Sequence, residues 1–137
     1  MPGLNLEFVS PESVLVSGDV DQVDLPGAEG DLGILPQHAP LVTTLRPGIV
    51  TVFRAGTTTQ IVVTGGFAEV GPGGLTVLAD KAVPRADYDL TLLGSEIRDA
   101  EEDVADAKDD AERDKLVRHL EQLKSLQAAL GTAAAAH

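Results

Sequence analysis

Histidine is the residue type in this chain best suited to acid–base chemistry or to metal binding near neutral pH. The sequence contains three histidines, His38, His119 and His137. No two of them have the spacing of a metal-binding pair, and no Ser or Asp is placed by a motif to form a catalytic triad with His38. We interpret His119 as a solvent-facing helix residue and His38 as a ring that orders its loop. A hydrolase that uses His38 is the alternative.

Two further patterns have some features of a chemical site. The stretch Gly71 to Gly74 lacks the Lys-Ser/Thr pair of a phosphate-binding loop and is typical of a turn. The carboxylates of residues 96–114 lack the spacing and the central glycine of a calcium loop, which favours a solvated helix face. The chain has no cysteine, which excludes disulfides and a thiolate nucleophile. We therefore predict no catalytic residue, no metal and no cofactor.

Composition limits the classes of partner. The formal net charge of −12 would repel a phosphate backbone, so nucleic acid is not expected to bind. The N-terminus has no basic and apolar signal region, and no run reaches the roughly 18 apolar residues of a membrane span. We expect a soluble protein whose membrane association is made only through partners. With three Phe, one Tyr and no Trp, its core must consist of Val, Leu and Ile.

Residues 1–86 have the pattern of an antiparallel β-sandwich domain. Leu4, Leu6 and Phe8 alternate with more polar positions, as in a half-buried strand. Further strands are predicted at 13–17, 20–25, 49–53, 57–64, 67–70 and 75–78. Turns are predicted at Pro26-Gly27, Ala55-Gly56 and Gly71–Gly74, and a bulge or close backbone approach at Gly65-Gly66. Turn signals recur about every 8–12 residues, which is typical of a sandwich or barrel.

Residues 87–137 predict an antiparallel two-helix hairpin with a frayed tail from Gly131 to His137. Asp87 or Asp89 is expected to cap the first helix. The apolar stripes are out of phase, which predicts a break near residues 108–111 with Asp109 or Asp110 as the second cap. A single bent helix is the alternative. The first stripe comprises Leu93, Ile97, Ala100, Val104, Ala107 and Ala111. The second comprises Leu116, Leu120, Leu123, Gln127 and Leu130, flanked by Val117 and Leu126.

The segment from Gly30 to Gly48, with sequence GDLGILPQHAPLVTTLRPG, is the most distinctive part of the chain. We interpret it as a rigid loop, since its glycines permit turns and its three prolines fix φ. Leu32, Ile34, Leu41 and Leu45 are expected to anchor it to the core. A loop that is already ordered is suited to binding, because its ordering entropy was lost during folding.

This segment resembles the epsilon subunit of bacterial F-type ATP synthases, whose loop reads Gly-acid-Leu-Gly-Ile-x-Pro-x-His-Ala-Pro-Leu. The stretches Gly65–Val70 and Thr76–Asp80 also match that family. The resemblance implies a non-catalytic rotor subunit of the central stalk. It would bind the gamma subunit and the ring of c subunits, and so couple proton translocation to ATP synthesis. Its implied location is peripheral, at the cytoplasmic face of the bacterial inner membrane.

The resemblance also implies site residues. Glu29, Gly30 and Asp31, with His38 close in sequence, would contact the c ring. The alternative is that Glu29 and Asp31 are solvated turn residues. Basic groups at Lys115, Arg118 and Lys124 are available for an inhibitory contact with the alpha/beta catalytic head.

Some family members bind ATP through an Asp-x-x-Arg-Ala sequence. Here Asp89 is followed by Leu92 at the Arg position, so the side chain that would pair with phosphate is missing. The competing class is a ligand-binding β-sandwich module. Such a module would usually display aromatics, and this chain offers only Tyr88.

Overall fold

A computed structural model describes the backbone of residues 3–135 and the side chains of residues 3–130. The chain divides into two compact units, with the boundary after Asp87. The first unit consists of β-strands and the second of two helices, so the predicted fold class is confirmed.

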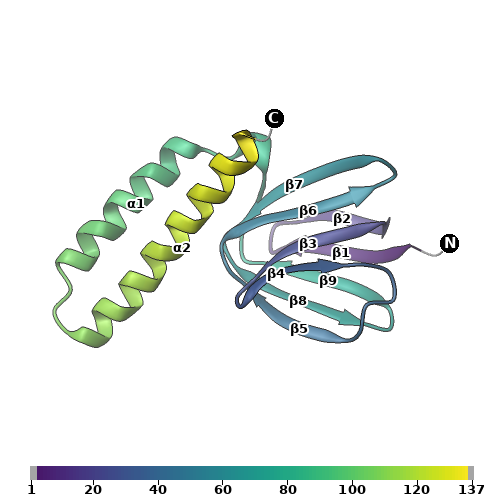
Figure 1. Ribbon diagram of the computed structural model, residues 1–137, viewed down its shortest axis with the longest axis horizontal. Coiled ribbons are helices and arrows are strands. Elements are labelled where there is room, and N and C mark those ends of the chain that lie inside the picture. The colour runs from purple at the N-terminus through teal and green to yellow at the C-terminus, as the bar shows by residue number, and fades with distance from the viewer. Residues whose placement is uncertain (1–2, 136–137) are drawn as a thin grey trace. The chain divides into compact units, whose positions relative to one another are not determined.

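Ten strands form the first unit (Figure 1). In chain order they are β1 (Leu4–Ser10), β2 (Ser13–Val20), β3 (Gln22–Gly27), β4 (Gly30–Ile34), β5 (Leu41–Leu45), β6 (Gly48–Arg54), β7 (Thr57–Val63), β8 (Gly66–Gly71), β9 (Gly74–Ala79) and β10 (Ala82–Pro84). A short 3-10 helix, η1 (Arg85–Asp87), follows β10.

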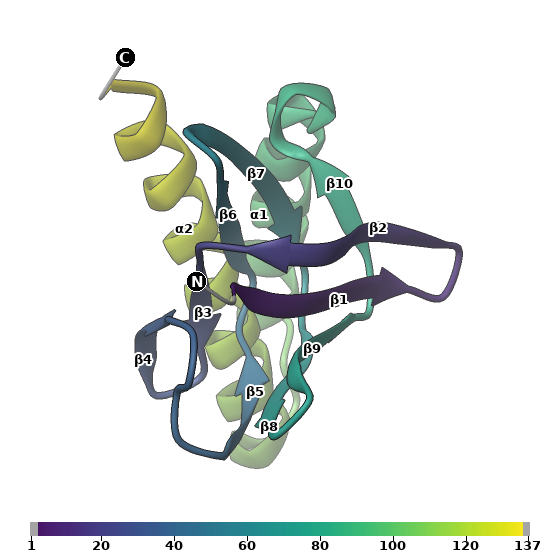
Figure 2. The same cartoon turned by 90° about the vertical axis from the view of Figure 1, so that its right-hand side faces the viewer.

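The strands form one continuous sheet in the order β10-β7-β6-β3-β5-β8-β9-β1-β2, with β4 added alongside β3. The sheet curls so that its two halves enclose a common interior (Figure 2). Where the curl closes, Arg54 of β6 reaches β2 and donates hydrogen bonds to the carbonyls of Asp19 and Ser17, at 3.0 and 3.1 Å. Among the described strands, β1 and β9 make the single parallel pair.

The core of this unit is aliphatic, as the composition predicted. Each large buried side chain contributes about 1.5–3 kcal/mol relative to exposure, before conformational entropy is subtracted. Phe8 is its one aromatic member. The cluster comprises Leu4, Leu6, Phe8, Val20, Val23, Leu25, Ile34, Leu45, Val50, Val52, Ile61, Val63, Ala68, Val70, Leu75, Val77 and Ala79.

Two of the predicted turns are confirmed and one is wrong. Ala55 and Gly56, both with positive φ (50° and 81°), join β6 to β7, and Gly71 pairs with Gly74 across the β8–β9 hairpin. Pro26-Gly27 is not a turn, because it is the end of β3, and the chain reverses at Ala28 and Glu29. Proline cannot donate to a strand ladder, but the Pro26 carbonyl still accepts a 2.9 Å hydrogen bond from the Arg46 amide.

The segment from Gly30 to Gly48 is not a loop throughout. It contains β4 and β5 and begins β6, and only residues 35–40 and 46–47 connect strands. The four anchors were predicted correctly. Ile34 and Leu45 are core residues, and Leu32 and Leu41 pack partly buried against the core. Glycine and proline suggested a loop. Instead, β4 pairs with the preceding strand β3 in a tight hairpin, and β5 pairs with β8, which is distant in sequence.

The second unit contains α1 (Leu90–Ala105) and α2 (Asp110–Ala135), which pack against each other. Asp89 caps α1, accepting hydrogen bonds from the amides of Thr91 and Leu92 at 2.9 and 3.1 Å. Residues 106–109 break the helix, so the hairpin rather than the single bent helix is correct. None of the described helices has the length and apolar character needed to cross a membrane.

The buried residues of the hairpin differ in part from the predicted stripes. They are Leu93, Ile97 and Ala100 of α1, with Leu123, Leu126 and Leu130 of α2. Ala107 lies in the connection, and Ala111 is exposed in the first turn of α2. Gln127 belongs to the predicted second stripe, but it is exposed and Leu126 is buried instead. Residues 131–135 of the tail are helical backbone, and residues 136–137 lie outside the described part.

Candidate interaction site

The tip of the β3–β4 hairpin contains three of the residues predicted to contact a partner. Gly27 pairs with Gly30 across the hairpin, so Ala28 and Glu29 form the reversal itself. Gly30 has φ 149°, a conformation that favours glycine. The Glu29 and Asp31 side chains are both exposed. The tip therefore presents two carboxylates on a short, tight turn.

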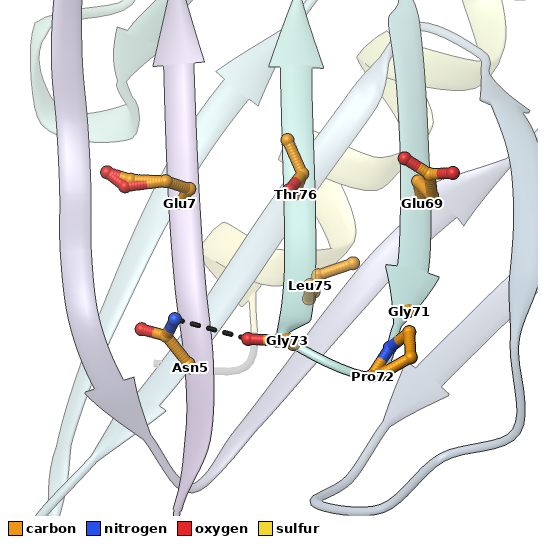
Figure 3. Close-up of a pocket in the computed structure, with 9 residues that line it drawn as sticks. Asn5, Glu7, Glu69, Gly71, Pro72, Gly73, Leu75 and Thr76 are labelled. Atoms are coloured by element: carbon orange, nitrogen blue, oxygen red, sulfur yellow. Dashed lines mark hydrogen bonds between the residues drawn. The ribbon is translucent and has the colours of Figure 1, made fainter.

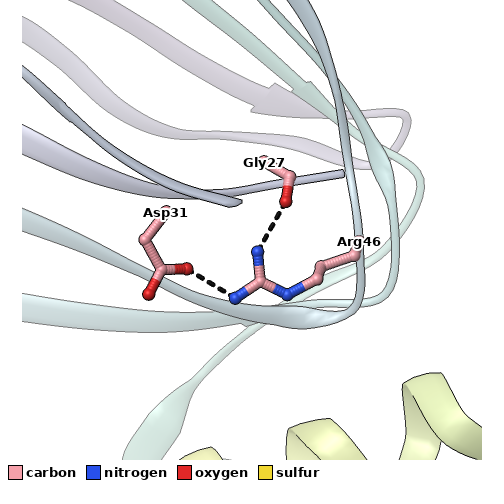
Figure 4. Close-up of polar contacts among 3 residues, drawn as sticks. All are labelled: Gly27, Asp31 and Arg46. Atoms are coloured by element: carbon pink, nitrogen blue, oxygen red, sulfur yellow. Dashed lines mark hydrogen bonds and ion pairs between the residues drawn. The ribbon is translucent and has the colours of Figure 1, made fainter. Parts of the chain in front are cut away.

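Arg46, which the sequence analysis did not single out, binds this tip (Figure 4). Its Nη2 lies 2.5 Å from Oδ1 of Asp31, and its Nη1 donates to the Gly27 carbonyl at 2.5 Å. The Arg46 side chain is 28% exposed and that of Asp31 is 80% exposed. One guanidinium group thus joins a backbone carbonyl and a side-chain carboxylate of the same hairpin.

His38 does not belong to the tip. It lies in the connection after β4, at the end of that strand opposite Gly30, and a strand of this length spans roughly 13 Å. The ring is half-buried, and its Nδ1 lies 2.7 Å from the carbonyl oxygen of Ala39. The His38 amide donates to the Leu35 carbonyl at 3.1 Å. The structure therefore brings Glu29, Gly30 and Asp31 together and leaves His38 apart from them.

A row of apolar side chains crosses the outer face of the sheet. Val14 of β2 pairs with Val9 of β1, Val9 with Leu78 of β9, and Leu78 with Phe67 of β8. Val14, Phe67 and Leu78 are 63%, 42% and 36% exposed. We call these four residues the apolar row. Part of it lines a shallow pocket of about 370 Å³ with Pro11 and Asp80.

A polar row lies beside the apolar row on the same face. Glu7 of β1 is opposite Thr76 of β9, which is opposite Glu69 of β8 (Figure 3). Ser17 donates to both Glu7 carboxylate oxygens, at 3.0 and 3.3 Å. Asn5 donates to the Gly73 carbonyl at 3.2 Å and helps to line a pocket of about 350 Å³. The face thus combines apolar contact area with two carboxylates at its border.

The predicted basic residues lie on the surface of α2. Lys115, Arg118 and Lys124 are all exposed. Lys124 makes a surface ion pair with Glu101 of α1, with Nζ 3.8 Å from the carboxylate oxygen. Such an exposed pair contributes about 0–1 kcal/mol, so it leaves the lysine available to a partner.

The start of α1 has no basic side chain at the position expected in an ATP-binding sequence. Leu92 occupies it, and its side chain is 55% exposed. The Asp89 carboxylate is already used by the two amides of the first turn.

Comparison with known proteins first defines the class. Residues 3–85 match the family model described as ATP synthase, Delta/Epsilon chain, beta-sandwich domain. This range is almost the whole of the first unit, and it contains both the tip and the outer face. The class is therefore that of the ATP synthase delta and epsilon chains.

Similar curated proteins narrow this class. The ATP synthase epsilon chain of Parvibaculum lavamentivorans is 54% identical over 125 residues, covering 90% of this chain and 95% of that protein. That of Rhodopseudomonas palustris is 48% identical over 134 residues and covers 98% of both chains. The chain belongs to the family of ATP synthase epsilon chains, as its motifs predicted. It is thus a non-catalytic stalk subunit of ATP synthase.

Solved structures agree with this assignment. A chain in the cryo-EM structure of the Euglena gracilis mitochondrial ATP synthase, which includes the c-ring, superposes with a TM-score of 0.79 at 28% identity. The match covers 95% of this chain and 82% of that one. A chain from the central stalk and c-ring of the Tetrahymena thermophila enzyme has a TM-score of 0.66 at 13% identity over 94% and 99%, which shows a shared fold.

Proposed function

We propose that this subunit binds the gamma subunit through the outer face of its sheet and the c ring through the β3–β4 tip. In this way it couples proton translocation to ATP synthesis. The observation that supports gamma binding is the apolar row, in which the exposed side chains of Val14, Phe67 and Leu78 lie beside the half-buried Val9 on the outer face of the sheet. Burying such a row against a partner is favourable at about 25 cal/mol per Å² of apolar area. The neighbouring Glu7 and Glu69 would select a partner with basic groups at the border.

The c-ring contact is assigned to Glu29, Gly30 and Asp31. Both carboxylates are exposed on a turn whose backbone is held by β3, β4 and Arg46, so their positions are fixed before binding. His38 is placed at the other end of β4. It is therefore the weakest member of the predicted contact set.

Co-elution of the full chain with purified gamma subunit on a sizing column tests the gamma contact. The wild type is expected to give a 1:1 peak at micromolar concentration. Phe67→Asp and Leu78→Asp are expected to weaken the complex by about tenfold or more each, because they place a charge in an apolar contact. Leu35→Asp is the matched control, since Leu35 is 54% exposed but lies outside the row. Equal loss with Leu35→Asp would contradict the assignment.

Restraint of ATP hydrolysis by the hairpin is a further part of the proposal. The exposed Lys115, Arg118 and Lys124 support it, since they could meet acidic segments of the alpha/beta head. Glu112, Asp114 and Glu121 on the same helix reduce the net positive charge. We expect Lys115→Ala with Arg118→Ala to raise ATP hydrolysis by the reconstituted enzyme. An unchanged rate would exclude these two residues from any inhibitory contact.

The subunit is proposed to reside at the cytoplasmic face of the bacterial inner membrane, held there by the complex. The bacterial relatives support this location. Washing membranes with a chaotrope should release the subunit together with gamma, and retention after gamma is removed would contradict it.

A further inference from the structure

We infer that Arg46 is a positioning residue for partner binding. It neutralises Asp31 and fixes the β3–β4 tip, which leaves Glu29 as the carboxylate that meets a cationic side chain of the partner. This inference rests on the proposed contact between the tip and the c ring. It assigns different roles to two carboxylates that are only two residues apart.

Arg46 is itself held firmly where the hairpin ends. Its amide donates to the Pro26 carbonyl at 2.9 Å, and the Ala28 amide donates to the Thr44 carbonyl at the same distance. A Cβ added at Gly48 would lie 2.6 Å from Cβ of Pro26, so the chain after Arg46 is also packed against β3. The backbone that bears the guanidinium therefore has little freedom relative to the tip.

The guanidinium has a geometry that orders the tip. Nη1 and Nη2 reach two groups on either side of the reversal, the Gly27 carbonyl and the Asp31 carboxylate (Figure 4). The planar fork of arginine can make both bonds at once, whereas a lysine ammonium cannot copy this geometry. The turn between the two is tight, because a Cβ at Gly27 would lie 2.6 Å from the Gly30 carbonyl oxygen. Removing the fork frees both ends of the turn.

The charges of the tip follow from these contacts. Asp31 is paired with Arg46, so the two together are close to neutral. Among the described residues, none makes a hydrogen bond or an ion pair with the Glu29 side chain. The tip therefore offers one unpaired negative charge at a fixed place. This chemistry suits a lysine or arginine in an exposed loop of the c subunit, and its contribution should decrease with added salt.

Two measurements on the full-length chain test the inference. One is amide hydrogen exchange at residues 28–31 in the isolated protein. The other is affinity for a detergent-solubilised complex of gamma with the c ring, at low and high salt. Arg46→Gln should raise exchange at the tip by about 3- to 10-fold and weaken ring binding by a similar factor. Arg46→Lys should not restore either property. Arg54→Gln is the matched control, because Arg54 also binds two backbone carbonyls but away from the tip.

The carboxylate variants separate the two roles. Glu29→Gln should leave tip exchange unchanged, weaken ring binding and flatten its salt dependence. Asp31→Ala should raise amide hydrogen exchange at the tip while Arg46 itself is retained. This variant therefore tests the inference even if Arg46→Gln folds poorly. Wild-type exchange in both Arg46→Gln and Asp31→Ala would overturn the inference while leaving the ring contact intact. A different result would overturn the proposed ring contact. In that case Glu29→Gln and Asp31→Ala would both bind the ring with wild-type affinity, while Asp31→Ala showed faster amide hydrogen exchange at the tip.

Discussion

The amide of Glu112 donates a 2.7 Å hydrogen bond to Oδ1 of Asp109, one residue before α2 begins. The Glu112 carboxylate in turn accepts a hydrogen bond from the Lys108 amide at 3.2 Å. This reciprocal arrangement resembles a capping box. Asp109 satisfies an amide of the first helical turn, and Glu112 satisfies an amide of the connection. The arrangement stabilises the start of α2, although residues 106–109 contain no glycine or proline.

Replacing Asp109 by Ala should therefore destabilise α2 by about 1 kcal/mol, because the Glu112 amide loses its acceptor. Urea unfolding followed by far-ultraviolet circular dichroism measures this change. Asp114→Ala is the control, since Asp114 is exposed further along the same helix. Equal effects of both substitutions would show that net charge, and not the cap, determines the stability of the helix.

Gly66 should not tolerate a side chain. Its φ is 134°, and an added Cβ would collide with the Leu78 carbonyl oxygen and lie 2.9 Å from Cα of Ala79. Gly66→Ala should destabilise the β-unit by about 3 kcal/mol or more, since backbone strain and overpacking combine. Gly71→Ala is the control, because nothing lies within 4 Å of its added Cβ. If urea unfolding of Gly66→Ala showed a decrease in the free energy of unfolding below about 1 kcal/mol, the backbone of β9 would be able to move away at little cost.

Tyr88 should titrate above its ordinary pKa. Burial raises the pKa of its phenol from 10.0, and the negative charges of Glu96 and Asp89 raise it further. The unfolded chain then loses its proton first as the pH rises. The neutral phenol thus contributes stability below pH 10.0, and this contribution is lost as the pH rises through the folded-state pKa. Ultraviolet absorbance reports the titration cleanly, because the chain has no second Tyr and no Trp.

The control for Tyr88 is Glu96→Gln, which removes one negative charge with little change in volume. It should lower the pKa of Tyr88 without returning it fully to 10.0, since burial is the larger cause. An unchanged titration would mean that Glu96 exerts no effect on the phenol in solution.

We propose that the β-unit is an independent domain, ending at Asp87. Its core cluster lies wholly within residues 4–79, and Arg85 donates a 2.8 Å hydrogen bond to Gln60 that secures its end. A chain of residues 1–87 should unfold cooperatively and bind gamma within a few-fold of the full chain, because the apolar row is retained. Loss of gamma binding in this truncation, with folding intact, would place the essential contact on the helices.

Much of the fold follows from local sequence. Several strands can be located from neighbouring residues alone. The signals are the alternation at Leu4, Leu6 and Phe8 and the turns at Ala55-Gly56 and Gly71–Gly74. The strands β4 and β5 could not be found in this way. β5 pairs with β8, which is distant in sequence. β4 is the second strand of a hairpin with β3, and this pairing overrides the loop propensity of Gly33. In α2, the adjacent residues Leu126 and Gln127 point in directions about 100° apart, and the apolar side chain is the one buried.

The site was predictable only in part. The motif identified Glu29, Gly30 and Asp31, but it also grouped His38 with them. His38 is close to them in sequence, whereas the extended strand β4 separates them in space. Arg46 was missed since its partners are 15 and 19 residues away. Three residues of the apolar row could have been predicted from strand alternation. Val9, Phe67 and Leu78 occupy the strand positions that alternate with buried Phe8, Ala68 and Val77, which marks them as outward-facing apolar residues.

The closure of the sheet by Arg54 also has a consequence for self-association. An open sheet has two edges whose free backbone groups can recruit another chain and start aggregation. Here the β2 edge has the Ser17 and Asp19 carbonyls occupied by Arg54, and the β10 edge is three residues long and ends in Pro84. Neither of these two edges is a good template for an added strand. Copies of the chain should therefore not join through β2 or β10, and other subunits should bind to the faces and turns of the sheet.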